Sequence, residues 1–99
     1  MPRDYRYVNP RELRLPSSRA TGPDPKRLQR QISQFGSSLV GMPPIWVYEA
    51  ADGALVIYNG VTRAMRIAIL SPGTKVPIEV VGKLSRSMLS ERSAGDLVP

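Results

Sequence analysis

Two short apolar runs separated by a turn constrain the fold of this chain more than any other feature of its sequence. Residues 45–48 and 55–58 are rich in β-branched and aromatic side chains, and the loop between them holds an Asp-Gly hairpin signal at residues 52–53. The second run ends in Asn-Gly at residues 59–60, and residues 61–70 follow with apolar side chains at helical spacing. The pattern predicts a hairpin that passes directly into a helix, with both strands in the middle of a sheet.

Another helix is predicted upstream of the hairpin, over residues 25–35. Asp24 is a suitable N-cap, and Pro25 suits the first helical position because its missing N–H group would have no partner there. Gly36 marks the end of the helix. Between these signals a single apolar stripe is formed by Leu28, Ile32 and Phe35.

Two further strands are predicted near the ends of the chain. Residues 5–8 alternate in type and favour a short strand, and residues 76–81 form a last strand in which Pro77 suits an edge or a strand start. The proline-rich segment 9–23 is predicted to be mostly loop, and loops of this length are usually functional or mobile.

The length of the chain limits it to one hydrophobic core. It has 99 residues, and a chain of this size buries only about two-thirds of its unfolded surface. We therefore expect one α+β domain in residues 1–82, with a mixed sheet of about four strands and two main helices. Residues 83–99 are rich in serine, arginine and glycine and are expected to form a mobile or partner-dependent tail.

The composition excludes several kinds of chemistry. The chain has no cysteine, which rules out disulfides, thiolate metal sites and cysteine nucleophiles, and no histidine, which removes the commonest general base and zinc ligand. No apolar run approaches the roughly 18 residues that a membrane span needs, and the first residues lack a signal-peptide core. We expect a soluble, cytoplasmic protein without a membrane partner.

The charge of the chain favours an anionic partner. Its net charge is +6, and eleven of its fourteen basic residues are arginines, whose guanidinium groups suit bidentate contact with phosphate. Nucleic acid, a nucleotide or another polyanion is the natural partner. The alternative is that the charge only confers solubility.

The turn between the second strand and its helix is the candidate binding site. The first N–H groups of a helix lack partners, and the helix dipole makes that end attractive to anions. Gly60 lets a ligand approach the backbone, and Asn59 precedes it with a polar group. Thr62, Arg63 and Arg66 follow on a narrow polar strip of the helix that we expect to stay open. Alternatively, Asn59 is an N-cap, Gly60 a tight-turn residue and Arg63 a solvated side chain.

Four motifs around this turn occur in a familiar order, namely PPIWV, DGALVIYNG, VTRAMRIAIL and VPIEVV. Their order and spacing resemble the ParB N-terminal/sulfiredoxin-like superfamily over about residues 5–82. The shared pattern is a PI-x-V strand, a short DG loop, a strand that ends in a G-x-x-R turn, and a helix. The resemblance implies a small α+β domain that handles phosphate at this turn.

The turn also departs from the best-known members of the superfamily. In sulfiredoxins it resembles GGCHR, so Val61 replaces the cysteine that attacks the phosphorylated sulfinic acid, Thr62 replaces the histidine, and sulfiredoxin chemistry is excluded. In chromosome-partitioning ParB proteins the turn resembles GERRxR and holds a nucleotide triphosphate. Gly60 and Arg63 match that motif, whereas Val61 and Thr62 do not.

The superfamily resemblance also implies that the loop before the first helix completes the site. Here the loop offers Glu12, Arg14 and Arg19. Arg19 is the candidate for a second phosphate ligand, the alternative being a solvent-facing cation. Glu12 is the candidate general base by similarity to serine-kinase members of the superfamily, the alternative being an inert exposed carboxylate.

Aromatic and acidic side chains on the hairpin suggest two further roles. Trp46, Tyr48 and Tyr58 are candidates for stacking on a base, although aromatic residues on strands more often serve packing. Glu49 and Asp52 flank the turn, where carboxylates usually face solvent, so no metal site is predicted.

Three functions fit these observations. The first is a module that binds nucleic acid and, by analogy with stand-alone superfamily members thought to be nucleases, cleaves it. The second is a nucleotide-dependent phosphotransferase or NTPase that places Gly60, Thr62 and Arg63 on the phosphates of a nucleotide triphosphate and uses Glu12 as base. The third is a non-catalytic regulatory module.

Overall fold

Four strands form one mixed sheet in the order β1-β4-β2-β3 in the computed structural model, which describes residues 3–98. β4 pairs antiparallel with β1 and parallel with β2, and β2 pairs antiparallel with β3. The predicted α+β class, the mixed four-stranded sheet and the two main helices are confirmed. The strands are β1 (Asp4–Val8), β2 (Ile45–Glu49), β3 (Leu55–Asn59) and β4 (Val76–Lys83).

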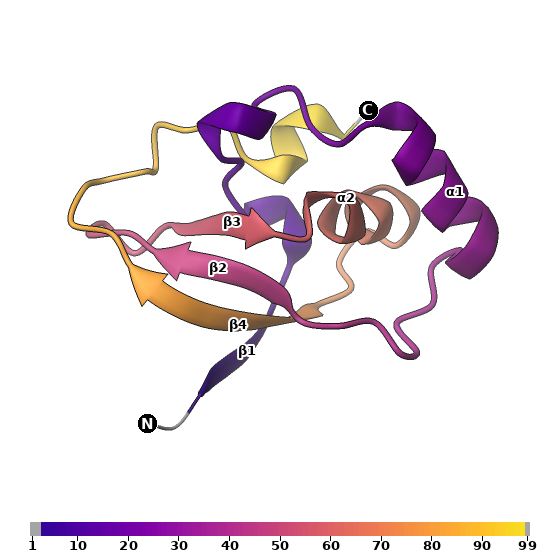
Figure 1. Ribbon diagram of the computed structural model, residues 1–99, viewed down its shortest axis with the longest axis horizontal. Helices are drawn as coiled ribbons and strands as arrows, with labels where there is room; N and C mark the ends of the chain where they lie inside the picture. The colour runs from indigo at the N-terminus through magenta and orange to yellow at the C-terminus, as the bar shows by residue number, and fades with distance from the viewer. Residues whose placement is uncertain (1–2, 99) are drawn as a thin grey trace.

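Both α-helices begin and end at the predicted residues. α1 spans Pro25–Phe35, with the Asp24 carboxylate accepting a hydrogen bond of 3.0 Å from the N–H of Lys26, and Gly36 follows it. α2 spans Val61–Leu70 and packs between the sheet and α1, so that α1 lies at the end of the molecule away from the hairpin turn (Figure 1). Neither helix of the described chain is long and apolar enough to cross a membrane. Three short 3-10 helices complete the secondary structure, η1 (Pro10–Glu12), η2 (Ser17–Arg19) and η3 (Ala94–Leu97).

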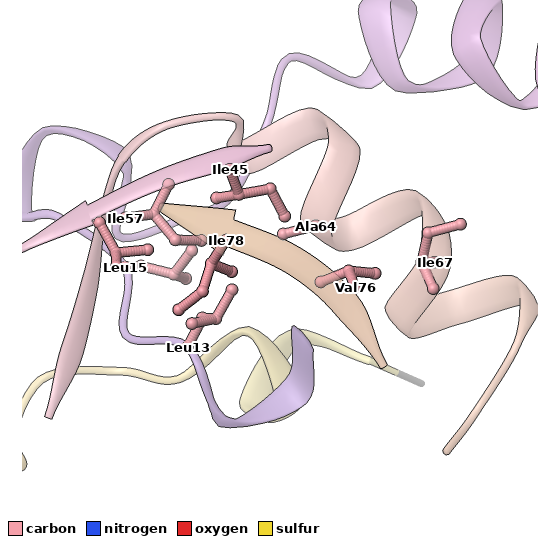
Figure 2. Close-up of a cluster of buried hydrophobic side chains, with 9 residues drawn as sticks. Leu13, Leu15, Ile45, Ile57, Ala64, Ile67, Val76 and Ile78 are labelled. Carbon is pink, nitrogen blue, oxygen red and sulfur yellow. The ribbon is translucent and has the colours of Figure 1, made fainter. Parts of the chain in front are cut away.

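The hydrophobic core lies between the inner face of the sheet and α2. Ile45 of β2, Ile57 of β3 and Ile67 of α2 are essentially buried there (Figure 2). Val47 of β2 belongs to the same buried cluster. The proline-rich segment adds two fully buried leucines, Leu13 and Leu15, to the same cluster. That loop is therefore anchored in the core at both sides of Arg14.

The prediction that both hairpin strands lie in the middle of the sheet holds for β2 and is wrong for β3. β3 is the last strand in the sheet order. Its free edge is covered by the loop, because the Arg14 N–H donates to the Leu55 carbonyl at 2.8 Å and the Ile57 N–H donates to the Arg14 carbonyl at 2.9 Å. β4 is central instead, and Pro77 stands at its start, as the second residue of the strand.

The segment after β4 packs on the domain, where the sequence predicts a mobile or partner-dependent tail. It runs back past β3 to η3, as the orange-to-yellow trace in Figure 1 shows. The Leu15 N–H donates to the Arg92 carbonyl and the Ala94 N–H to the Leu13 carbonyl, both at 2.7 Å. Met88 is buried in a small second cluster with side chains of the hairpin. The predicted division near residue 82 has no counterpart in this packing.

Candidate anion-binding site

The junction between β3 and α2 leaves the start of the helix open. Gly60 takes a left-handed conformation, with φ +115°, and occupies the N-cap position. Asn59 is exposed, and no side chain of residues 3–98 caps the helix. The N–H groups of the first helical turn, Val61 to Arg63, thus lack a side-chain acceptor in the described chain, and the helix dipole adds partial positive charge at the same place.

The side chain of Arg63 folds back over this junction. Its Nη2 donates to the Pro44 carbonyl at 3.2 Å, and its Nε is buried without a partner among the described residues. Burial lowers the pKa of Arg63, and no described carboxylate lies within 4.0 Å of its guanidinium. A partly buried charge without a counter-ion costs free energy, so this arrangement favours an anion beside it.

The junction lines a cleft of about 700 Å³. The walls come from η2 and the loop after it, from α1, from the end of β3, and from the segment after β4. Four arginines line the cleft, against two carboxylates, those of Asp24 and Glu91. The arginines are Arg19, Arg27, Arg63 and Arg86.

Most of the predicted binding residues meet in this cleft. Asn59, Gly60, Thr62 and Arg63 line it from the β3–α2 junction, and Arg19 lines it from η2. Of the three loop residues considered for the site, Glu12, Arg14 and Arg19, Arg19 lines the cleft and the other two do not. Whether these residues bind phosphate stays a prediction.

Arg66 does not lie on an open polar face of α2, and that prediction is wrong. The residue is 2% exposed, and its Nη1 donates to the carbonyls of Gly36 at 2.6 Å and Ser38 at 2.9 Å. Its guanidinium lies 5.4 Å from the centre of the Phe35 ring. Arg66 therefore fastens the end of α1 to α2, and helical spacing did not reveal this because the contacts come from a distant segment.

Glu12 is not part of the cleft either. It is an exposed residue of η1 and is not among the residues that line the cleft, so its predicted place opposite the turn is wrong. Arg14 does not line the cleft either. Its Nη1 donates to the Glu91 carbonyl at 3.0 Å, and it lines a separate cavity with Arg92 and Asp96. The loop turns its leucines inward on either side of Arg14, and this places neither Glu12 nor Arg14 at the junction.

Four charged residues of the cleft were missed by the sequence analysis. Asp24 was considered only as an N-cap, and Arg27, Arg86 and Glu91 were not considered as site residues. Arg27 is exposed on α1 and lines the cleft. Its position on the predicted helix directly after the loop of Arg19 could have identified it as a candidate. Arg86 and Glu91 belong to the segment after β4, and nothing in their local sequence indicates that it folds back. They reach the cleft because Asp52 holds this segment by accepting hydrogen bonds from the N–H groups of Met88 and Leu89.

The two carboxylates considered for a metal serve other contacts. Glu49 forms an ion pair of 3.0 Å with Arg6, and Asp52 accepts the backbone hydrogen bonds just described. Within residues 3–98, no group of three or more acidic, histidine or cysteine side chains is placed to hold a metal ion.

Comparison with known proteins finds no counterpart. No family model, no curated protein and no solved structure matches this chain.

Proposed function

We propose that this chain binds a phosphate-bearing ligand in the cleft, with nucleic acid as the ligand class. The observation that carries the proposal is the position of Arg63, whose guanidinium lies partly buried over Gly60 with no described carboxylate within ion-pair distance. The first N–H groups of α2 have no side-chain cap among the described residues, so they also favour an anion at this place. The strand-turn-helix pattern predicts an anion-binding site at this junction, and the superfamily resemblance implies the same place.

The charge around the cleft supports a polyanion. Arg19, Arg27 and Arg86 line it at separate points of the wall, so they suit successive phosphates of a strand better than one isolated phosphate. The net charge of +6 adds long-range attraction, which raises the rate of encounter with nucleic acid. Binding of this kind weakens steeply as the salt concentration rises.

A free nucleotide is the second candidate ligand, and the size of the cleft favours it. About 700 Å³ falls in the range of about 300–1,000 Å³ that is usual for small-molecule sites, and Tyr48 and Tyr58 add aromatic wall. The proposal assigns binding and no catalytic step, because Glu12, the base that the resemblance implied, lies outside the cleft.

Side-by-side binding measurements with Arg63→Ala test the proposal. We expect Arg63→Ala to weaken binding of a short DNA by about tenfold or more, since a hydrogen bond to a charged group contributes about 1.5–3 kcal/mol. Arg30→Ala is the matched control, because Arg30 is an exposed arginine that does not line the cleft. ATP and CTP titrations over a range of salt concentrations separate the two ligand classes. Equal binding by Arg63→Ala and the parent protein contradicts the proposal.

A further inference from the structure

The face of the sheet opposite the core carries an exposed aromatic cluster. Side chains alternate along a strand, so Trp46 and Tyr48 point away from the face that Ile45 and Val47 bury, and Tyr58 points away from the face of Ile57. Trp46 is 43% exposed and Tyr58 is 59% exposed. Large exposed aromatic groups that lie together commonly mark a binding surface.

The cluster, formed by Trp46, Tyr48 and Tyr58, has a defined geometry. The rings of Trp46 and Tyr58 are nearly parallel, with centroids 6.3 Å apart and 10° between their planes. Tyr48 meets Tyr58 edge to face at 5.3 Å. Tyr48 lies so closely on Gly82 of β4 that a Cβ there would come within 2.6 Å of its ring. The missing side chain at Gly82 leaves room for the Tyr48 ring, and Tyr48 in turn contacts Tyr58.

The aromatic cluster is continuous with the basic cleft. Tyr48 and Tyr58 line the cleft together with Arg63 and Arg86, and Trp46 pairs across the hairpin with Asn59, next to Gly60. Glu79 lies beside Trp46 on the neighbouring strand, but its carboxylate is 3.9 Å from the Arg3 guanidinium. Exposed rings therefore border a surface that attracts phosphate.

We infer that the aromatic cluster stacks the bases of single-stranded nucleic acid whose phosphates lie in the cleft. The inference rests on the proposed function and names its substrate class. Aromatic rings beside a positively charged groove are the common means by which proteins hold single strands, because every base has a face on which to stack. A duplex keeps its base faces inside the stack and cannot use the rings.

The single tryptophan of the chain reports directly on this surface. We expect a single-stranded DNA of about ten nucleotides to quench Trp46 fluorescence in a saturable way, and the duplex of the same sequence to leave it nearly unchanged. Trp46→Ala should weaken single-strand binding by about fivefold or more and leave duplex binding unaltered, because Trp46 does not line the cleft. Tyr58→Ala should weaken single-strand binding by a similar factor. Trp46→Phe keeps a ring and should retain most of the affinity, and this variant covers the case in which the alanine variant folds poorly. Tyr7→Ala is the control, because Tyr7 is an exposed ring of β1 at the opposite edge of the sheet.

The outcomes separate the two proposals. If a single strand binds in a manner that depends on Arg63 while Trp46 emission and the Trp46→Ala affinity stay unchanged, the stacking inference is overturned and the cleft is upheld. If neither form of DNA binds, the inference and nucleic acid as the ligand are both overturned, whereas a nucleotide titration that depends on Arg63 still upholds the cleft. If Trp46 becomes buried as the concentration of the protein rises in the absence of DNA, a second copy of the chain covers this face, and the inference is overturned.

Discussion

The guanidinium of Arg63 packs directly on Gly60, so that a Cβ at Gly60 would lie 3.0 Å from Nη2 of Arg63. Gly60 also has φ +115°, which other residues rarely adopt. The two residues therefore depend on each other. The glycine makes room for a partly buried charge, and the charge lies where the N–H groups at the start of α2 are open.

Gly60→Ala should disturb both the backbone and the site. We expect a loss of unfolding free energy of about 1–3 kcal/mol from the strained conformation, together with weaker ligand binding as Arg63 is displaced. Gly73→Ala is the matched control, since Gly73 also has a positive φ, +85°, but a Cβ there meets no atom within 4 Å. Urea unfolding and DNA titration measure the two effects. Full binding by a folded Gly60→Ala variant would show that the contact with Arg63 is dispensable.

Arg66→Ala should damage stability and not ligand binding. The substitution removes two hydrogen bonds to backbone carbonyls and the contact with Phe35, and we expect a loss of about 2–4 kcal/mol of unfolding free energy. At a temperature where the variant is folded, its affinity for DNA should stay within about twofold of the parent, because Arg66 does not line the cleft. If the Arg66→Ala variant is stable but no longer binds DNA, Arg66 takes part in ligand binding and this prediction is wrong.

Glu91→Gln should strengthen binding of an anion. Glu91 is one of two carboxylates in the cleft, and removing its charge leaves the shape of the wall nearly unchanged. We expect the affinity for a short DNA to rise by roughly threefold at low salt, as one repulsive charge pair near a protein surface is removed, and the gain to shrink in high salt. Glu12→Gln is the control, because that carboxylate lies outside the cleft. Equal gains in the two variants would indicate a general charge effect and no local one.

The segment after β4 should loosen in acid because of Asp52. Burial alone would raise the pKa of Asp52, but hydrogen bonds from the N–H groups of Leu89, Ala54 and Met88 outweigh it and hold the pKa below its usual value. A depressed pKa means that the attachment is complete above about pH 4 and is lost as the pH falls through the folded-state pKa. Asp52→Ala should release the segment at neutral pH.

Limited trypsin digestion and hydrogen exchange check this prediction. Cleavage after Arg86 should be faster in Asp52→Ala than in the parent, and the amide protons of Met88 and Leu89 should lose protection both in the variant and in the parent in acid. Protection that is independent of pH and of the substitution would mean that the packing of Met88 holds the segment without Asp52.

The sequence predicts the features of this fold that depend on neighbouring residues. The bounds of α1 follow from Asp24 and Gly36, and the start of α2 follows from the turn at Gly60, because caps and turns are local. The position of β3 at the end of the sheet order does not, since strand order depends on pairings between distant segments. The covering of its edge by Arg14 is equally non-local.

The candidate site was predictable to the same extent. The junction residues and Arg63 follow from the strand-turn-helix pattern, and Arg19 from the superfamily resemblance. Arg66 was assigned wrongly because helical periodicity shows which residues lie on the same face of a helix, but it does not show what covers that face. Here the chain after α1 covers Arg66. Arg86 and Glu91 were missed because a serine-rich segment shows no local sign of the hydrogen bonds that fold it back on the hairpin.

A titration of the isotope-labelled protein with a short single-stranded DNA, followed amide by amide by NMR, tests the central claim most directly. The account predicts that the backbone signals of Val61, Thr62 and Arg63 shift together and saturate with the same affinity as the side-chain signal of Arg63. Shifts confined to other parts of the molecule, with these amides unmoved at saturation, would contradict it.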